Sequence, residues 1–281
     1  MHAFSAISQR IVSRIKLDKS LNEISGLERL NDSILIAIND GGNLAEIIFL
    51  NTKGEILKRT KIINAKNNDW EDLATDDLGN LYISDSGNNS NNRQDLCILK
   101  VNAQAAYKSD SISTEKIFFK YSNQKAFPPP LNEQVFDCEA LLCRKDSLHL
   151  ITKIKANIHG KENRFPKDYV LPALAGSYIA KESHDSLNYL VRVGNKGIQD
   201  LVTSIDCRYE KVVVLTYSAI TVHSLAENSN EAIFVEKHQK LRFKKLTQKE
   251  AVLLFSEKTI FVASEKHKFL GGPYLYKIKL P

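Results

Sequence analysis

The sequence has no long apolar runs. No stretch of its 281 residues approaches the ~18 consecutive apolar residues of a membrane-spanning helix, so no transmembrane segment is predicted. The first residues, Met1–Ile7, also lack the charged and apolar regions of a secretory signal peptide. The chain is therefore expected in the cytoplasm or, if a leader has been removed, as an exported protein.

Metal-binding and redox patterns of cysteine are absent as well. Cys97, Cys138, Cys143 and Cys207 form no Cys-x-x-Cys pair and have no histidine partners at zinc spacing. We interpret them as small buried hydrophobic residues. Histidine is also missing from the repeated polar positions described below, so no Ser-His-Asp or Cys-His arrangement can be assembled.

A strong net charge is missing too. The 39 basic and 33 acidic residues give a formal charge of +6, and the lysines are scattered along the chain. The one basic cluster, residues 240–245, fits a solvated face better than a nucleic-acid surface, because its basic and aromatic residues form no recognisable RNA- or DNA-binding module. Nucleic acid is therefore not a predicted partner.

Helical periodicity is nearly absent from the sequence. Its apolar segments are short, rich in β-branched residues and separated by Asn, Asp, Gly and Ser, which predicts an all-β fold. The segment 76–80 (Asp-Asp-Leu-Gly-Asn) separates two such runs and predicts a hairpin, since Gly and Asn tolerate positive φ. The stretch 102–114 is polar and is expected to be a loop.

One strand-opening pattern occurs five times, starting at Glu23, Asp69, Asp137, Thr203 and Gln248. The openings are 46, 68, 66 and 45 residues apart. The two short intervals have the length of one propeller blade, and the two long ones are explained by a blade with an additional loop. Residues 1–281 are therefore predicted to form a single β-propeller of five four-stranded antiparallel blades. Residues 10–17 would complete the last blade and close the ring. Six blades are the alternative, if residues 176–200 form a degenerate blade.

Polar residues at equivalent repeat positions should converge in space, because the first strand of each blade lines the central axis. The predicted channel residues are mostly carboxylates. They are Glu23, Asp40, Asp69, Glu71, Asp72, Asp85, Asn88, Asn89, Arg93, Asp137, Glu139, Lys153, Asp206, Tyr217, Glu250 and Glu265.

So many acids near one axis need a compensating partner, because neighbouring carboxylates raise each other's pKa. A hard divalent cation such as Ca²⁺ is one such partner, since it binds several oxygen ligands in loose geometry. The predicted metal ligands are Asp72, Glu139, Asp206 and Glu250. The alternative is architectural, with these acids accepting backbone N–H bonds from neighbouring blades.

The motifs resemble those of uncharacterised bacterial β-propeller proteins of the Bacteroidetes type, which are distantly similar to esterase-like phytase and lactonase-type propellers. The resemblance rests on segments 68–72, 79–89 with Arg93, 137–141 and 152–153. It covers most of the chain and fades after residue 154. It implies a propeller with an acid-lined axial site and no defined substrate. Asp40-Gly41-Gly42 departs from the Asp-Ser-Gly of the relatives and removes a hydroxyl ligand.

Two functions stay open from the sequence. The first is a monomeric binding propeller without catalysis, whose acids hold a cation and whose channel mouth takes a small molecule or peptide. The second is a metal-dependent hydrolase of phosphate or carboxylic esters or lactones, with Lys153 and Tyr217 beside the acids. No nucleophile or general base stands out, which favours the first.

Overall fold

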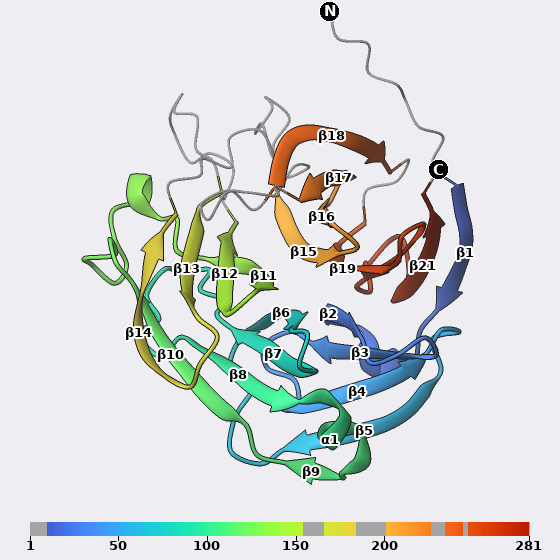
Figure 1. The fold of residues 1–281 in the computed structure, drawn as a ribbon, viewed down its shortest axis with the longest axis horizontal. Helices are drawn as coiled ribbons and strands as arrows, with labels where there is room; N and C mark the ends of the chain where they lie inside the picture. Colours follow the sequence, from blue (N-terminus) through green and yellow to red (C-terminus); the bar gives the residue numbers. More distant parts are fainter. Residues whose placement is uncertain (1–9, 154–165, 184–200, 226–233, 244–246, 281) are drawn as a thin grey trace, which may run out of the picture.

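The computed structural model describes residues 10–153, 166–183, 201–225, 234–243 and 247–280. In these residues, strands are arranged radially around one axis, as the sequence predicts for a propeller (Figure 1). The first group of strands is β2 (Ile24–Arg29), β3 (Ile34–Asn39), β4 (Glu46–Asn51) and β5 (Ile56–Ile62). The second is β6 (Trp70–Thr75), β7 (Asn80–Asp85), β8 (Cys97–Asn102) and β10 (Glu115–Tyr121).

Three further groups complete the ring. The third is β11 (Cys138–Arg144), β12 (Ser147–Thr152), β13 (Asp168–Pro172) and β14 (Gly176–Glu182). The fourth is β15 (Val202–Arg208), β16 (Lys211–Thr216), β17 (Ala219–Leu225) and β18 (Phe234–Arg242). The last is β19 (Lys249–Ser256), β20 (Thr259–Ser264), β21 (Tyr274–Lys279) and, from the other end of the chain, β1 (Arg10–Lys16).

The ring is closed by the N-terminal strand, as predicted. β1 pairs antiparallel with β21 and forms the outer strand of the last group. The five innermost strands β2, β6, β11, β15 and β19 are neighbours in that order, and β19 contacts β2. The number of blades stays a prediction. Residues 176–182 form β14 in the third group, and residues 184–200 lie outside the described residues.

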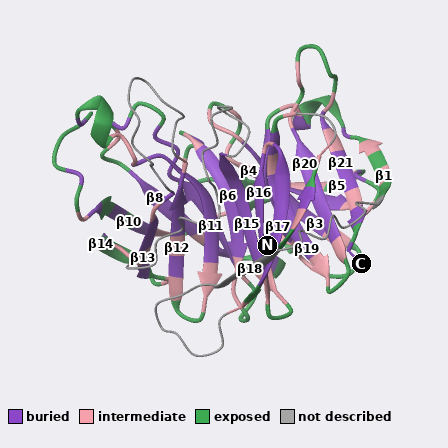
Figure 2. Cartoon of the chain, turned by 90° about the horizontal axis from the view of Figure 1, so that it is seen from above, coloured by how far each residue is buried: buried purple, intermediate pink, exposed green. Residues whose placement is uncertain are grey.

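Local sequence explains the hairpins. In the predicted 76–80 turn, the Asp76 carboxylate accepts hydrogen bonds from the backbone N–H groups of Leu78 and Asn80, and Gly79 has φ +80°. The inner strands of each group are buried on both faces, because neighbouring groups pack against both (Figure 2). Their continuous apolar runs reflect this. Outer strands such as β10 instead alternate between buried and exposed residues.

Two features of the outer edge were not predicted. The polar stretch 102–114 contains a short helix, α1 (Ala103–Lys108), capped by the Asn102 side chain, and a short strand, β9 (Ser111–Ile112), paired parallel to β5. In addition, β10 pairs in parallel with β14, which joins the second and third groups into one eight-stranded sheet. No helix in the described part of the chain has the length and apolar character to cross a bilayer.

At the axis, the inner strands meet without forming a sheet with one another, so their backbone donors need other acceptors. Asp72, 1% exposed, accepts hydrogen bonds from the backbone N–H groups of Leu141 (3.1 Å) and Ile205 (3.3 Å). It also accepts one from the hydroxyl of Ser204 (3.1 Å), whose oxygen in turn accepts the N–H of Val252. One carboxylate thus ties β6 to β11 and β15, and through Ser204 to β19.

We expect Asp72→Ala to lower the free energy of unfolding by roughly 3 kcal/mol or more, because each buried donor left without an acceptor costs about 1–3 kcal/mol. Urea or thermal denaturation measures this. Asp77→Ala, in the exposed part of the 76–80 turn, is the matched control and should change stability little. Equal stability of the two variants would contradict the role assigned to Asp72.

Candidate functional site

The register of each first hairpin brings the start of an inner strand beside the end of the second strand. Trp70 pairs with Asp85, Cys138 with Thr152 and Lys249 with Ser264. Residues just outside these pairs are joined by backbone hydrogen bonds, such as Lys153 N–H to Asp137 O (2.7 Å). The predicted residues just before the inner strands, such as Asp69 and Asp137, therefore lie at the same end of the axis as those at the ends of the second strands, such as Asp85 and Lys153.

Seven carboxylates gather at this end, which we call the acidic mouth: Asp40, Asp69, Glu71, Asp137, Glu139, Glu250 and Glu265. Carboxylate oxygens of Asp40, Asp69 and Glu71 all lie within 4.8 Å of one another. A second group with the same spacing consists of Glu71, Asp137 and Glu139. Residues from β6, β11 and the end of β3 thus converge, although nearly 100 positions separate Asp40 from Glu139.

Glu71 belongs to both groups and is the most enclosed of the first. It is 8% exposed, and none of the donors in the described residues hydrogen-bonds to its carboxylate. Burial raises the pKa of Glu71 well above its usual value, and the carboxylates of Glu139 and Asp40 raise it further. Its neighbours within reach are therefore acids rather than donors.

Two glycines allow the backbone to approach these carboxylates closely. A Cβ atom on Gly87 would lie 2.2 Å from Glu71 Oε1 and 2.5 Å from Asp69 Oδ2. One on Gly41 would lie 2.7 Å from Asp69 Oδ1. Any larger residue at either position would fill the space against the Asp69 carboxylate. The Asp-Gly-Gly departure noted in the sequence thus places a backbone, not a hydroxyl, beside the acids.

Like-charge repulsion and burial act on the whole acidic mouth. Burial raises the pKa of Asp69 to about 6, with Asp40 adding to the rise. Burial also raises the pKa of Glu250 to about 7, against the opposing effect of Lys153. The pKa of Glu265 is raised the most of these three, to about 9, by burial and then by the carboxylate of Glu250. In the absence of a cation, protons therefore remain on part of this cluster at neutral pH.

A loop following β7 supports the acids from one side. Arg93 donates to the carboxylate of Asp85 (3.0 Å) and to the carbonyl of Gly87 (2.8 Å). Asp85 in turn accepts the backbone N–H of Asp69 (3.1 Å). The backbone N–H of Asn88 donates to Asp137 (2.7 Å). Of the predicted site residues, Asp85, Asn88 and Arg93 thus position the site.

Lys153 and Tyr217 lie on the other side of the cluster. Lys153 Nζ is 2.8 Å from Glu139 Oε2 and 5.5 Å from the centre of the Tyr217 ring. Burial would lower the pKa of Lys153, but Glu139 and the other neighbouring acids raise it overall, so the ammonium stays charged. Burial raises the pKa of Glu139, and Lys153 limits that rise. Tyr217 hydrogen-bonds to Glu250.

The predicted metal set Asp72, Glu139, Asp206 and Glu250 does not come together in the described residues. Asp72 lies deeper along the axis with its oxygens on backbone donors, and Asp206 accepts the N–H groups of Leu254 and Cys207 (2.7 Å each). Both carboxylates thus accept backbone N–H groups, which is the arrangement that the architectural alternative describes. Glu23 and Asn89 are exposed at the rim.

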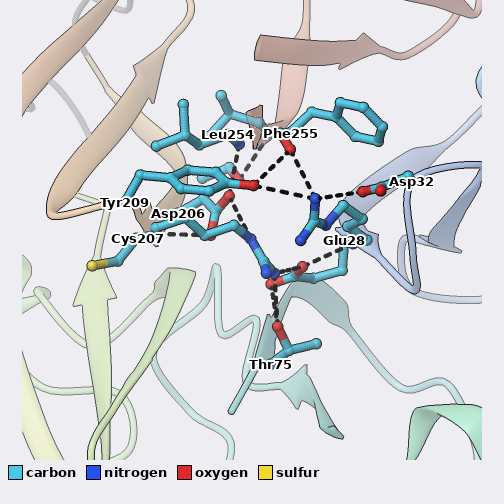
Figure 3. A network of polar contacts seen from close by, with 12 residues as sticks. Glu28, Asp32, Thr75, Asp206, Cys207, Tyr209, Leu254 and Phe255 are labelled. Atoms are coloured by element: carbon cyan, nitrogen blue, oxygen red, sulfur yellow. Dashed lines mark hydrogen bonds and ion pairs between the residues drawn. The ribbon is translucent and has the colours of Figure 1, made fainter. Parts of the chain in front are cut away.

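A second polar network closes the opposite end of the axis (Figure 3). Arg208 at the end of β15 pairs with Glu28 of β2 and donates to the hydroxyl of Thr75 (2.7 Å) at the end of β6. Sequence reasoning missed this network. Its signal was Glu28, an acidic residue that directly follows Leu27 near the end of β2. A cavity of about 230 Å³ beside it carries charges of both signs, from Arg29, Lys145, Asp76 and Asp77 among others.

Solved structures similar to this chain include β-propellers. They include the WD40 β-propeller domain of Doa1 (8% identity, TM-score 0.45, covering 98% of this chain and 97% of that one). Another is Myxococcus xanthus glutaminyl cyclase, with 9% identity and a TM-score of 0.49, covering 96% of this chain and 95% of that one. A third is the PQQ-bound aldose sugar dehydrogenase of Streptomyces coelicolor, with 9% identity and a TM-score of 0.48, covering 97% of this chain and 98% of that one. No family model and no curated protein matches the chain. These similarities concern the fold, and no activity is inferred from them.

Glu265 predicts a pH dependence of stability. Its pKa is about 9 in the folded protein and near 4.5 when unfolded, so folding takes up a proton between these values. The stabilisation is full below pH 4.5 and is lost as the pH rises through 9. Thermal melts of chelator-treated protein should show Glu265→Gln melting above wild type at pH 9 and at the same temperature near pH 4.5. A constant difference at both pH values would contradict this.

Proposed function

We propose that this chain binds a hard divalent cation at the acidic mouth, with Asp40, Asp69, Glu71, Asp137 and Glu139 as the oxygen ligands. The observation that carries the proposal is Glu71: a carboxylate 8% exposed, with no donor among the described residues and four acids around it. An uncompensated charge in such a place is costly, and a cation removes the cost.

The donor chemistry favours Ca²⁺ or a similar ion. In the described residues the two groups with ligand spacing contain carboxylates alone, without histidine or cysteine. Oxygen-only sets suit Ca²⁺, Mg²⁺ and Mn²⁺ rather than zinc or copper. Gly41 and Gly87 place no side chain against the Asp69 and Glu71 oxygens. We propose a binding role, with a small molecule or peptide at the mouth and membership of the bacterial propeller group that the motifs resemble.

The first test is stabilisation by the cation. At a hundredfold excess over Kd, ligation adds about 2.7 kcal/mol, or roughly 5–10 °C in Tm for a chain of this size. We expect Ca²⁺ to raise Tm, EDTA to reverse the rise, and Glu71→Gln to lose most of it. Glu115→Gln, on the exposed face of β10, is the control and should behave as wild type. No shift in wild type with any of Ca²⁺, Mg²⁺ or Mn²⁺ would reject the proposal.

A second test fills the space without changing any charge. Gly87 lies outside the positive-φ region, so Gly87→Ala leaves the backbone unstrained while its Cβ would overlap Glu71 Oε1 and Asp69 Oδ2. We expect this variant to bind Ca²⁺ at least roughly tenfold more weakly by calorimetry, about 1.4 kcal/mol. Ser90→Ala, an exposed position in the same loop, should bind normally. Normal affinity in Gly87→Ala would place the cation elsewhere.

Lys153 and Tyr217 support a second candidate, a metal-dependent hydrolase of phosphate or carboxylic esters or lactones. An ammonium 2.8 Å from Glu139 and a phenol beside it could hold a developing negative charge next to a metal-polarised ester. We expect any hydrolysis of aryl phosphates, aryl esters or lactones to be abolished by EDTA and by Lys153→Met, and to persist in Glu115→Gln. Turnover that survives EDTA would exclude this mechanism.

A further inference from the structure

The two groups of acids at the mouth share one residue. A carboxylate oxygen of Glu71 lies within 4.8 Å of oxygens of Asp40 and Asp69 in one group, and one lies within 4.8 Å of oxygens of Asp137 and Glu139 in the other. A carboxylate has two oxygens and can therefore bind two cations at once, one through each oxygen. We infer that the acidic mouth holds a pair of divalent cations bridged by Glu71, an inference that rests on the proposed cation binding.

Charge balance supports two cations over one. The five ligands carry up to five negative charges, and a single divalent cation together with the Lys153 ammonium leaves two of them uncompensated in a partly buried site. Two cations together with the ammonium of Lys153, 2.8 Å from Glu139, match the five charges. Since unpaired buried charge is strongly unfavourable, the second cation has an electrostatic reason to bind.

The two groups of acids differ in the hydrogen bonds and ion pairs that their carboxylate oxygens already make. In the first group, Asp40 accepts one local bond from Gly41 N–H, and the carboxylates of Asp69 and Glu71 face the other acids. In the second group, Asp137 accepts the N–H of Asn88 (2.7 Å) and Glu139 is paired with Lys153. The first cation therefore binds to Asp40, Asp69 and Glu71. The second binds more weakly, because Lys153 competes for Glu139.

Mn²⁺ is the probe that tests the bridge directly. Calorimetry and elemental analysis of the dialysed full chain give the number of ions bound, and electron paramagnetic resonance reports whether two Mn²⁺ ions share a ligand through exchange coupling. We expect two ions per chain with a coupled spectrum at saturation. Glu71→Gln should bind fewer than two ions and lose the coupling, whereas Glu115→Gln should match wild type.

Variants of Lys153 provide a second test of the bridged pair. Lys153→Met removes the competing ammonium and should tighten the second binding step by roughly tenfold or more, with the first step unchanged. Lys153→Gln, which also lacks the charge, serves the same purpose if the methionine variant does not fold.

The outcomes separate this inference from the proposed function. One ion per chain, or two ions without coupling, overturns the bridged pair and leaves cation binding standing. Coupling that persists in Glu71→Gln, or a second step that Lys153 variants do not tighten, also overturns the pair. No bound ion in wild type overturns both.

Discussion

The structure depends on which groups accept hydrogen bonds from the backbone N–H groups at the inner edges of β2, β6, β11, β15 and β19. In the described residues these strands contact one another around the axis without backbone pairing, and β11, β15 and β19 bring backbone donors to this buried region. Asp72, Ser204 and Asp206 accept those donors from strands that belong to other groups. These short polar side chains at the axis thus accept the backbone hydrogen bonds that a neighbouring strand accepts within a sheet. They thereby connect strands of different groups across the centre of the ring.

The acidic residues along the axis are of two kinds, and they differ in how deeply they lie. Asp72 and Asp206 are deep and have backbone donors, so each negative charge is matched by directed hydrogen bonds. At the mouth, Asp69 and Glu71 lie beyond those donors and face Asp40, Asp137 and Glu139 instead. The same residue types are therefore structural in one layer and available to a cation in the next. The difference lies in what surrounds them, not in their chemistry.

The two ends of the axis are also unlike. At the far end Arg208 reaches Glu28 of β2 and Thr75 of β6, so a cation of the chain itself compensates the acids there (Figure 3). At the mouth, Lys153 forms an ion pair with Glu139, one of the seven carboxylates named there. The uncompensated charge is thus concentrated at one end, which is where an external cation gains most.

The sequence by itself determined the propeller, the closing strand and the end of the molecule where the acids gather. These follow from turn residues such as Asp76 and Gly79, from short apolar runs, and from a repeat whose equivalent positions must converge in a ring. Local chemistry and symmetry are enough for that. The short helix after Asn102 was not predicted, because it depends on one capping side chain within an otherwise polar stretch.

Only the tertiary structure decided which acids share a space. Asp72 and Glu71 are neighbours in sequence, yet alternate side-chain directions along β6 send one to the inner edges of β11 and β15 and the other to the mouth. Likewise, nothing in the sequence indicates that Arg208 meets Glu28, because the two lie on inner strands that are not neighbours in the ring. A repeat fixes the ring position of each residue, but side-chain direction and partners across the axis depend on all five strands together.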